Sequence, residues 1–256
     1  MSIEKKMKKQ PLFWLIFDPI TWRLLRHVAV SLIGRGVTVP EPTLLRVQEF
    51  IQMKRLLDEL AINVVIDVGA NRGQTAMLLR GLGFRGYIYS FEPQSHVFAI
   101  LERTLRKDPK WKGFQVALGE ASTSLELYVH PESDEMSSLL RFEHPQGTYQ
   151  ETVQVIRLDS LFSSLVESIP LPRVFLKIDT EGYDLAVFRG AANFLPNIFA
   201  LQVELFVHSA HVQAPHYLDA LKEYEQAGFN LVNLSLNTRA ESGDVCTMNA
   251  LMRRVI

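Results

Sequence analysis

The chain has 256 residues, of which 47% are hydrophobic and 10% aromatic, enough to build one α/β domain with a small appended segment. Its formal net charge of -1 argues against a nucleic-acid partner, because such domains are usually strongly basic. The single cysteine, Cys246, excludes an intramolecular disulfide and a zinc site of several thiolates, which fits a reducing cytoplasm. Apolar runs stop short of the roughly 18 residues that a membrane helix needs, so we expect a cytoplasmic protein.

The N-terminal region is basic and rich in aromatic residues. Residues 1–39 contain seven Lys or Arg residues and two acidic ones, a local charge of +5 (seven minus two), and apolar residues alternate with the bases. This pattern predicts one or two amphipathic helices, and a further helix is expected at 43–60. We therefore expect residues 1–60 to form a helical extension that caps a domain spanning 61–256. Peripheral contact of the basic segment with an anionic membrane is the alternative.

From residue 61 on, short apolar segments alternate with segments of helical periodicity, as is typical of a parallel sheet with helices on both faces. Strands of this sheet are expected at 64–68, 87–91, 114–118, 174–178 and 200–205, and helices at 70–82, 96–106, 184–195 and 217–227. Two extra strands, 124–130 and 151–157, indicate an insertion near one edge. The last two strands, 230–236 and 246–254, follow each other directly and should be antiparallel. The expected fold is a mostly parallel seven-stranded sheet with an antiparallel last strand.

A glycine-containing loop, Asp67-Val-Gly-Ala-Asn-Arg-Gly73, follows the first strand. Gly69 and Gly73 let the backbone turn sharply and approach a ligand, at which the next helix points its free N–H groups. Glu92 ends the second strand 19 residues after Gly73 (92 minus 73), where a carboxylate can bind the ribose hydroxyls of an adenosine cofactor. We therefore expect a nucleotide cofactor at the carboxyl edge of the sheet.

The same loop indicates which cofactor binds. The dinucleotide pattern G-x-G-x-x-G is absent, and Asp67 would repel a pyrophosphate while attracting the ammonium and sulfonium groups of S-adenosylmethionine. Asp67, Gly69, Asn71, Gly73 and Glu92 are the residues expected at this cofactor. An NAD-type oxidoreductase on a similar sheet is the alternative. Asp67 has a structural alternative too, in which it only orders the loop.

Charged residues gather where the strand at 174–178 ends. Methyl transfer is an in-line displacement that needs an aligned nucleophile and a base for its proton. The candidate catalytic residues are Lys177, Asp179, Glu181, Glu204 at the end of the strand 200–205, and His208 just beyond it. The three carboxylates could also supply the oxygen ligands that Mg²⁺ takes, although their spacing does not demand a metal.

Each of these candidates also has a purely structural interpretation. Lys177 and Asp179 can form an ion pair, and Glu181 can lie in the first turn of the next helix. His208 and His211 can be solvated loop residues. The sequence leaves these alternatives open.

Seven segments resemble the FkbM-type S-adenosylmethionine-dependent methyltransferases, in the family's order. They are Ile66–Gly73, Phe91–Pro93, Ala117–Gly119, Ser137–Ser138, Leu158–Asp159, Leu176–Tyr183 and Arg189–Ala191. The resemblance covers about residues 62–254. It implies a Rossmann-like class I methyltransferase fold, S-adenosylmethionine as cofactor, and methylation of a hydroxyl on a sugar, glycan or secondary metabolite. It also adds Ala70, Pro93, Ala117 and Leu118 to the expected cofactor residues.

We therefore expect an O-methyltransferase with a small-molecule or glycan acceptor and no nucleic-acid partner. A homo-oligomer is compatible with the sequence. A different class of function, a non-catalytic membrane-associated binding protein that acts through its basic N-terminus, is the further alternative.

Overall fold

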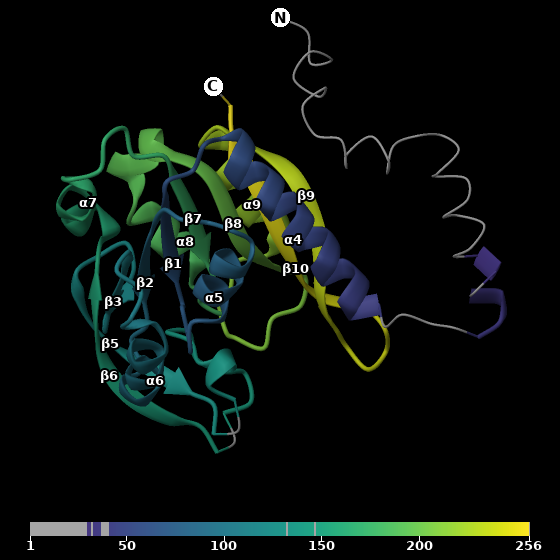
Figure 1. Ribbon diagram of the computed structural model, residues 1–256. Coiled ribbons are helices and arrows are strands. Elements are labelled where there is room, and N and C mark those ends of the chain that lie inside the picture. The colour runs from purple at the N-terminus through teal and green to yellow at the C-terminus, as the bar shows by residue number, and fades with distance from the viewer. Residues whose placement is uncertain (1–29, 32, 37–40, 132, 146, 256) are drawn as a thin grey trace, which may run out of the picture. The chain divides into compact units, whose positions relative to one another are not determined.

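The computed structural model describes residues 30–31, 33–36, 41–131, 133–145 and 147–255 (Figure 1). The chain divides into two compact units, Met1–Leu44 and Leu45–Ile256. Apart from helical residues at 30–31 and 33–34, the predicted amphipathic helices of the basic segment lie outside the described residues, and so does the predicted membrane contact. None of the helices in the described part of the chain has the length and hydrophobicity of a membrane-spanning helix.

A seven-stranded sheet forms the centre of the second unit, in the order β3-β2-β1-β7-β8-β10-β9. Its strands are β1 (Val64–Val68), β2 (Tyr87–Phe91), β3 (Trp111–Phe114), β7 (Val174–Ile178), β8 (Ile198–Phe206), β9 (Phe229–Arg239) and β10 (Val245–Arg254). Strand β10 lies between β8 and β9 and is antiparallel to both, whereas the other neighbours are parallel. The predicted sheet with an antiparallel last strand is therefore confirmed.

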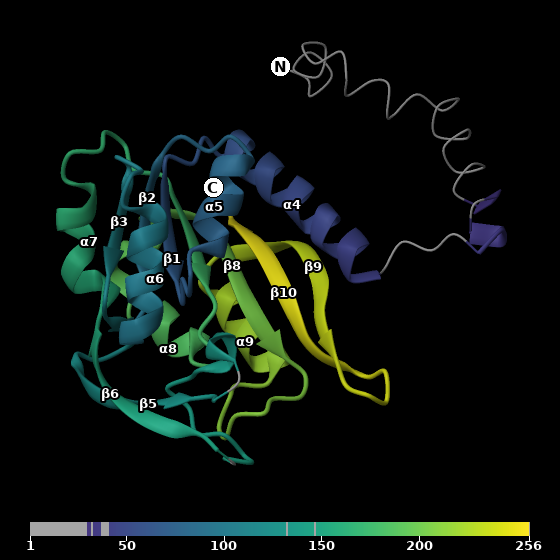
Figure 2. The same ribbon diagram turned by 60° about the horizontal axis from the view of Figure 1, so that its bottom comes forward.

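Helices cover both faces of the sheet, because alternate residues of each buried strand point to opposite sides (Figures 1 and 2). Val64, Ile66 and Val68 pack in one core cluster with α7 (Leu158–Val166), α8 (Asp184–Arg189) and α9 (Tyr217–Gln226). Val65 faces the other cluster, with α4 (Glu41–Glu59), α5 (Gln74–Gly81) and α6 (Ser95–Leu105). All five residues of β1 are buried, as expected for a β-branched run in a parallel sheet.

The insertion forms a second sheet of three strands in the order β4-β6-β5, beyond β3 in Figure 1. Its strands are β4 (Ala117–Leu118), β5 (Thr123–Val129) and β6 (Tyr149–Ile156), and a short 3-10 helix, η1 (Asp134–Met136), lies in the connection from β5 to β6. The strand predicted at 114–118 is wrong in its extent. Phe114 ends β3 opposite Phe91, and the chain then bends so that Ala117 pairs with Val155 in the second sheet.

The helix predicted at 184–195 is shorter than expected. Helix α8 ends at Arg189, and a 3-10 helix, η2 (Ala192–Asn197), follows it. The break lies at Gly190, where a Cβ would stand 2.0 Å from the carbonyl oxygen of Gly119, so only glycine fits against the loop after β4. Glycine is also a poor residue for a helix interior. Pro196 also lacks the N–H that an α-helix interior requires.

Helix α4 is attached to the sheet by apolar and polar contacts. Met53, Leu56 and Leu57 are buried in the core below it. One or two turns earlier, the buried carboxylate of Glu49 accepts hydrogen bonds from side chains of three strands. The donors are Gln202 Nε2 at 2.6 Å, Ser235 Oγ at 3.3 Å and Asn249 Nδ2 at 3.3 Å. This network fixes the helix where it carries Arg46 to the edge of the functional site.

Candidate cofactor and catalytic site

The parallel strands end at a cavity of about 310 Å³. Ten of the residues predicted for the site line it, namely Gly69, Ala70, Asn71, Glu92, Pro93, Ala117, Leu118, Lys177, Asp179 and Glu181. Four other predicted residues, Asp67, Gly73, Glu204 and His208, are not among the described lining residues. The carboxyl edge therefore gathers most of the candidates, and the other four lie outside the described lining of the cavity.

The loop after β1 is held tightly between the ends of its neighbouring strands. The backbone N–H groups of Gly69 and Ala70 both donate to the carbonyl oxygen of Phe91, at 3.0 Å each. Gly69 has φ +71°, and a Cβ on it would lie 1.8 Å from the carbonyl oxygen of Asp179. Only glycine can therefore bring β1 and β7 this close at the cavity.

Gly73 has a different role from Gly69. Its φ is +93°, and a Cβ would lie 3.0 Å from side-chain atoms of Leu101 and Leu105. The glycine thus permits close packing of the first turn of α5 against α6, away from the cavity. Gly73 is the last residue of the loop before α5, and Asn71 in the same loop also has a positive φ, +45°.

Glu92 lies at the end of β2 and is only 7% exposed. Its Oε2 accepts a hydrogen bond from the backbone of Asn71 at 3.0 Å, and its Oε1 accepts one from Gln94 at 2.9 Å. Burial raises the pKa of Glu92 to about 7, even though these N–H groups favour the charged form. Each oxygen keeps acceptor capacity for a ligand in the cavity.

Lys177 is buried and forms an ion pair with an aspartate on each side. Its Nζ lies 3.3 Å from Asp67 Oδ1 and 3.1 Å from Asp179 Oδ2, and it also donates to the carbonyl oxygen of Gly69 at 3.3 Å. Burial alone would lower the pKa of Lys177, but the charges of Asp179 and Asp67 outweigh it and raise this pKa. The structural interpretation of Lys177 and Asp179 as an ion pair is correct.

Asp67 is fully buried behind this lysine. Burial raises its pKa, and the charge of Lys177 opposes that shift. Because Asp67 is covered and its ion pair is with Lys177, the expectation of a direct charge contact with a cofactor loses its geometric basis. Neither of its carboxylate oxygens accepts a hydrogen bond from a described residue, so the alternative in which Asp67 orders the loop by accepting its N–H groups has no support either.

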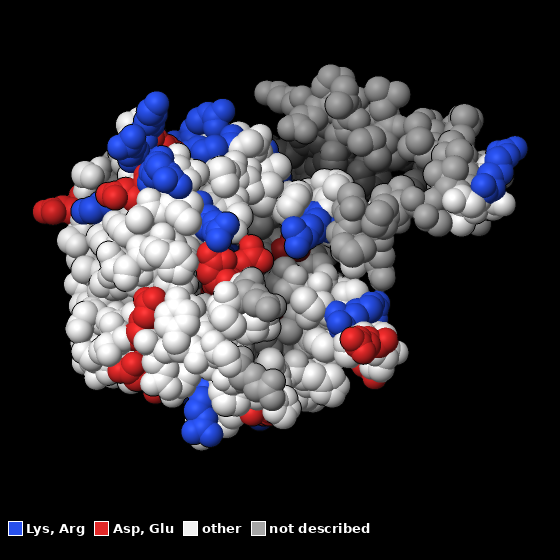
Figure 3. Space-filling view, turned by 90° about the horizontal axis from the view of Figure 1, so that it is seen from below, with Lys and Arg blue, Asp and Glu red and all other residues white. Residues whose placement is uncertain are grey.

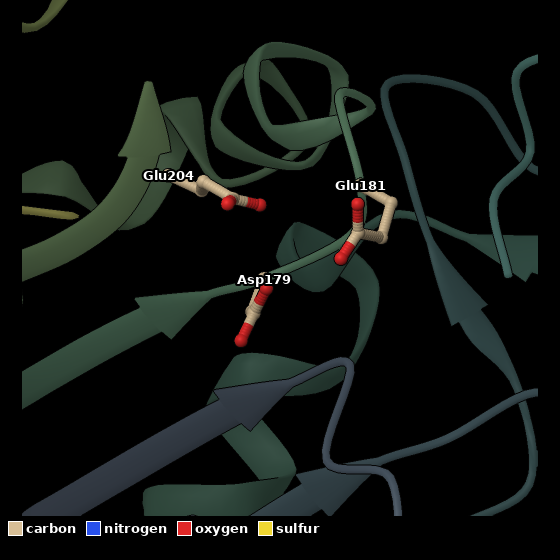
Figure 4. Close-up of side chains that lie close together, drawn as sticks. All are labelled: Asp179, Glu181 and Glu204. Atoms are coloured by element: carbon tan, nitrogen blue, oxygen red, sulfur yellow. The ribbon is translucent and has the colours of Figure 1, made fainter. Parts of the chain in front are cut away.

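Three carboxylates, those of Asp179, Glu181 and Glu204, converge beside the cavity, and we call them the acidic cluster (Figure 4). One oxygen of each lies within 4.8 Å of the others. Unit charges about 4 Å apart repel by roughly 4 kcal/mol at an effective dielectric constant of about 20. Burial, together with this repulsion, raises the pKa values of Glu181 and Glu204. The cluster therefore holds protons or a cation more readily than separate carboxylates would.

Loop contacts hold the acidic cluster in place. Glu181 has φ +53°, a conformation that few residues other than glycine adopt, and the hydroxyl of Ser138 donates to its carbonyl oxygen at 2.8 Å. Asp184 accepts from the hydroxyl of Thr180 at 3.0 Å and from the backbone N–H of Glu204 at 3.3 Å. Glu181 thus lies in a turn before α8 and not in the first turn of the helix.

The two histidines after β8 differ. His208 is exposed, and its backbone N–H donates to Cys246, so the solvated interpretation holds for it. His211 is 3% exposed and packs against Phe142 with ring centroids 4.5 Å apart, so this interpretation is wrong for it. Burial lowers the pKa of His211 to about 4, which keeps the ring neutral at physiological pH.

Several residues that line the cavity were not predicted from the sequence. Arg46 reaches the cavity from α4 and Asn237 from β9, and the connection between β5 and β6 adds Asp134 and Glu135. Their positions depend on tertiary packing of elements far apart in the chain. The lining carries five acidic and two basic residues, a balance of -3 (two minus five). Figure 3, which views the carboxyl ends of the strands, shows acidic side chains gathered near the middle of this face, beside basic ones.

The strand order, the glycine loop after β1 and the acid that ends β2 define a Rossmann-like class I fold of an S-adenosylmethionine-dependent methyltransferase. The family model described as the methyltransferase FkbM domain matches residues 67–231. The chain therefore belongs to the FkbM methyltransferase family. This assignment confirms the predicted family, fold class and cofactor, and it argues against an NAD-type oxidoreductase.

The solved structures that match the chain have very low sequence identity to it and TM-scores below 0.5. An rRNA methylase from Streptococcus thermophilus matches with a TM-score of 0.45 and 10% identity, covering 86% of this chain and 100% of that one. A TehB-like S-adenosylmethionine-dependent methyltransferase from Corynebacterium glutamicum matches with a TM-score of 0.39 and 10% identity, covering 93% of this chain and 100% of that one. A Streptococcus mutans protein in complex with S-adenosylhomocysteine matches with a TM-score of 0.45 and 9% identity, covering 85% of this chain and 100% of that one. No curated protein matches the chain.

Proposed function

We propose that the chain transfers the methyl group of S-adenosylmethionine to a hydroxyl of a small molecule or glycan. The observation that carries this proposal is that Asp179 and Glu181 line the same cavity as Glu92. A hydroxyl becomes a good nucleophile only as it loses its proton, and the acidic cluster provides acceptors for that proton next to the cofactor.

The charge of the cavity supports an acceptor that is not a nucleic acid. Five acidic residues against two basic ones would repel a phosphate backbone, whereas nucleic-acid sites gather Lys and Arg. A neutral acceptor with several hydroxyls pays no such electrostatic penalty. Polar groups such as Asn237 and Ser137 on the same wall can hydrogen-bond to them.

In the proposed complex, Glu92 accepts hydrogen bonds from the ribose hydroxyls of the cofactor. The backbone of Gly69, Ala70 and Asn71 lies along its methionine end, and the apolar side chains of Ala117 and Leu118 pack against its base. Pro93 fixes the chain direction after β2. This arrangement leaves the methyl group near the acidic cluster.

The chemical step is a single displacement. The acceptor oxygen forms a bond to the methyl carbon, the bond from this carbon to sulfur breaks, and its electron pair stays on sulfur to give neutral S-adenosylhomocysteine. The hydroxyl proton passes to a carboxylate of the acidic cluster. Alignment of the reacting atoms supplies most of the rate, and a base adds about 10²- to 10⁴-fold.

Cofactor binding tests the arrangement directly. We expect S-adenosylhomocysteine to bind the purified chain in isothermal titration calorimetry, and Glu92→Ala to weaken binding at least tenfold, because two charge-assisted hydrogen bonds are each worth about 1.5–3 kcal/mol. Glu102→Ala, at an exposed position on α6, is the matched control and should bind like the wild type. Absence of binding at millimolar ligand would overturn the proposal.

The acceptor class is tested by S-adenosylhomocysteine release. The assay compares sugars and polyhydroxylated small molecules with an rRNA fragment, and we expect turnover only with the former. Glu181→Gln should lower this rate by about 10²-fold or more if the acidic cluster takes the proton. Turnover only with the rRNA fragment would refute the hydroxylated small-molecule acceptor.

A further inference from the structure

The acidic cluster contains more negative charge than a single proton acceptor needs. Figure 4 shows Glu204 extending from the end of β8 toward Glu181, with Asp179 at the third corner of the group. The three side chains come from two neighbouring strand ends, and their ligand oxygens lie within 4.8 Å of one another. Such a group is stable only when something positive or protonated lies between its members.

The strongest sign of a missing partner is Glu204. This residue is 6% exposed, and among the described residues its Oε2 has no hydrogen-bond partner. Its Oε1 is fixed by Asn237 Nδ2 at 2.8 Å, so the side chain cannot turn freely to find another donor. A buried carboxylate oxygen without a donor is costly, and the Glu204 carboxylate as a whole is directed into the cluster (Figure 4).

The nearest fixed cation does not fill this gap. Lys177 already lies between Asp67 and Asp179 at 3.3 and 3.1 Å, and Glu181 and Glu204 are not among its ion-pair partners. The cofactor has only one net positive charge, whereas the cavity lining has a balance of -3 (two basic minus five acidic residues) before Glu204 is counted. Counted as formal charges, a negative excess therefore remains with the cofactor bound, and it is offset by bound protons or by a cation.

We propose that Asp179, Glu181 and Glu204 bind one divalent cation of the Mg²⁺ or Mn²⁺ type. The ligands are all carboxylate oxygens, which such hard cations prefer over nitrogen or sulfur. Adjacent ligands of an octahedral Mg²⁺ ion with bonds of about 2.1 Å lie about 3.0 Å apart and opposite ones about 4.2 Å apart, so the three oxygens, which lie within 4.8 Å of one another, would close on the ion through side-chain shifts of about 1–2 Å. Asp179 is exposed to the cavity, which gives the ion a path of entry.

A bound cation would also restrict the chemical class of the methyl acceptor, and this part of the inference rests on the proposed function. Three protein ligands leave about three positions of an octahedral ion for water or substrate. An acceptor with two adjacent hydroxyls could occupy two of them. The ion would lower the pKa of a bound hydroxyl, so the proton could leave to water while the carboxylates act as ligands instead of bases.

Metal binding is measured on the full chain without cofactor or acceptor. The protein is stripped with a chelator, dialysed, and titrated calorimetrically with MgCl₂ and, separately, MnCl₂. We expect one ion to bind per chain, and Glu204→Gln and Glu181→Gln each to weaken binding at least tenfold. Glu225→Gln, on the exposed face of α9, is the matched control and should bind like the wild type. Circular dichroism checks that each variant is folded, which we expect because a neutral amide relieves repulsion in the cluster.

The outcomes separate this inference from the proposed function. No binding of either ion at millimolar concentration, or unchanged binding by Glu204→Gln, would overturn the metal site. If the same preparation still binds S-adenosylhomocysteine, the proposed methyltransferase stands with the acidic cluster as base. Metal binding that is lost in both variants supports the site even if the acceptor assays fail.

Discussion

Glu92 shows how burial and function compete at a single residue. Its pKa is raised to about 7 by burial, so near neutrality a large fraction of the carboxyl is protonated in the ligand-free protein. This shift makes the ligand-free protein less stable as the pH rises from the ordinary value of 4.5 through about 7, because the folded state binds the proton more tightly than the unfolded chain does. Ribose hydroxyls donate to the charged form and therefore favour deprotonation.

Cofactor affinity should consequently depend on pH through Glu92. Between pH 6 and pH 8 the charged fraction of a group with a pKa of about 7 rises about tenfold, so we expect S-adenosylhomocysteine to bind up to about tenfold more tightly at pH 8. Calorimetric titrations at several pH values measure this. Glu92→Gln should bind weakly with little pH dependence across this range, and an equally steep profile in that variant would show that another group is responsible.

The positions of site residues could be predicted where local structure determines them, whereas their roles stay predictions. Gly69, Glu92 and Lys177 could be placed from the sequence because strand ends and the turns that follow them determine their positions. The role of Gly73 could not, because it depends on Leu101 and Leu105 of another helix. Which of the candidate carboxylates serves in catalysis stays a prediction.

At the scale of elements, α4 shows why a periodic apolar pattern does not by itself identify the buried face. Met53, Leu56 and Leu57 are buried, but Val47 and Ile51 of the same helix are 49% and 60% exposed. This part of α4 is attached to the sheet instead by the hydrogen bonds of Glu49, a charged residue that a hydrophobicity pattern would place on the solvent side. Likewise, the strand predicted at 114–118 is divided between two sheets, because pairing partners distant in sequence determine where each strand ends.

The Glu49 network should contribute measurably to stability. Glu49→Ala leaves the donors of Gln202, Ser235 and Asn249 without their acceptor, so we expect the free energy of unfolding to fall by about 1–3 kcal/mol in urea titrations. Glu59→Ala, which removes an exposed pair with Arg55 on the same helix, should cost less than about 0.5 kcal/mol. Equal losses in the two variants would contradict a structural role for the buried network.

For the whole molecule, a ligand that binds the cavity of the folded chain raises the free energy of unfolding. A ligand at 100 times its Kd stabilises the folded state by about 2.7 kcal/mol, and in a domain of this size each kcal/mol raises Tm by about 2–4 °C. We therefore expect saturating S-adenosylhomocysteine to raise Tm by about 5–10 °C in differential scanning calorimetry. The Glu92→Ala variant at the same ligand concentration should shift less, and an identical shift would place the ligand elsewhere.

The position of β10 has a consequence for biosynthesis. This strand (Val245–Arg254) follows β9 in the sequence, yet it fills the gap between β8 and β9 and is the sheet neighbour of both. While the ribosome still holds these residues, β8 lacks one neighbour and the emerging β9 has no partner in the sheet. A nascent chain can therefore assemble β1, β2, β3, β7 and β8 early, but β10 must leave the exit tunnel before β9 can join the sheet.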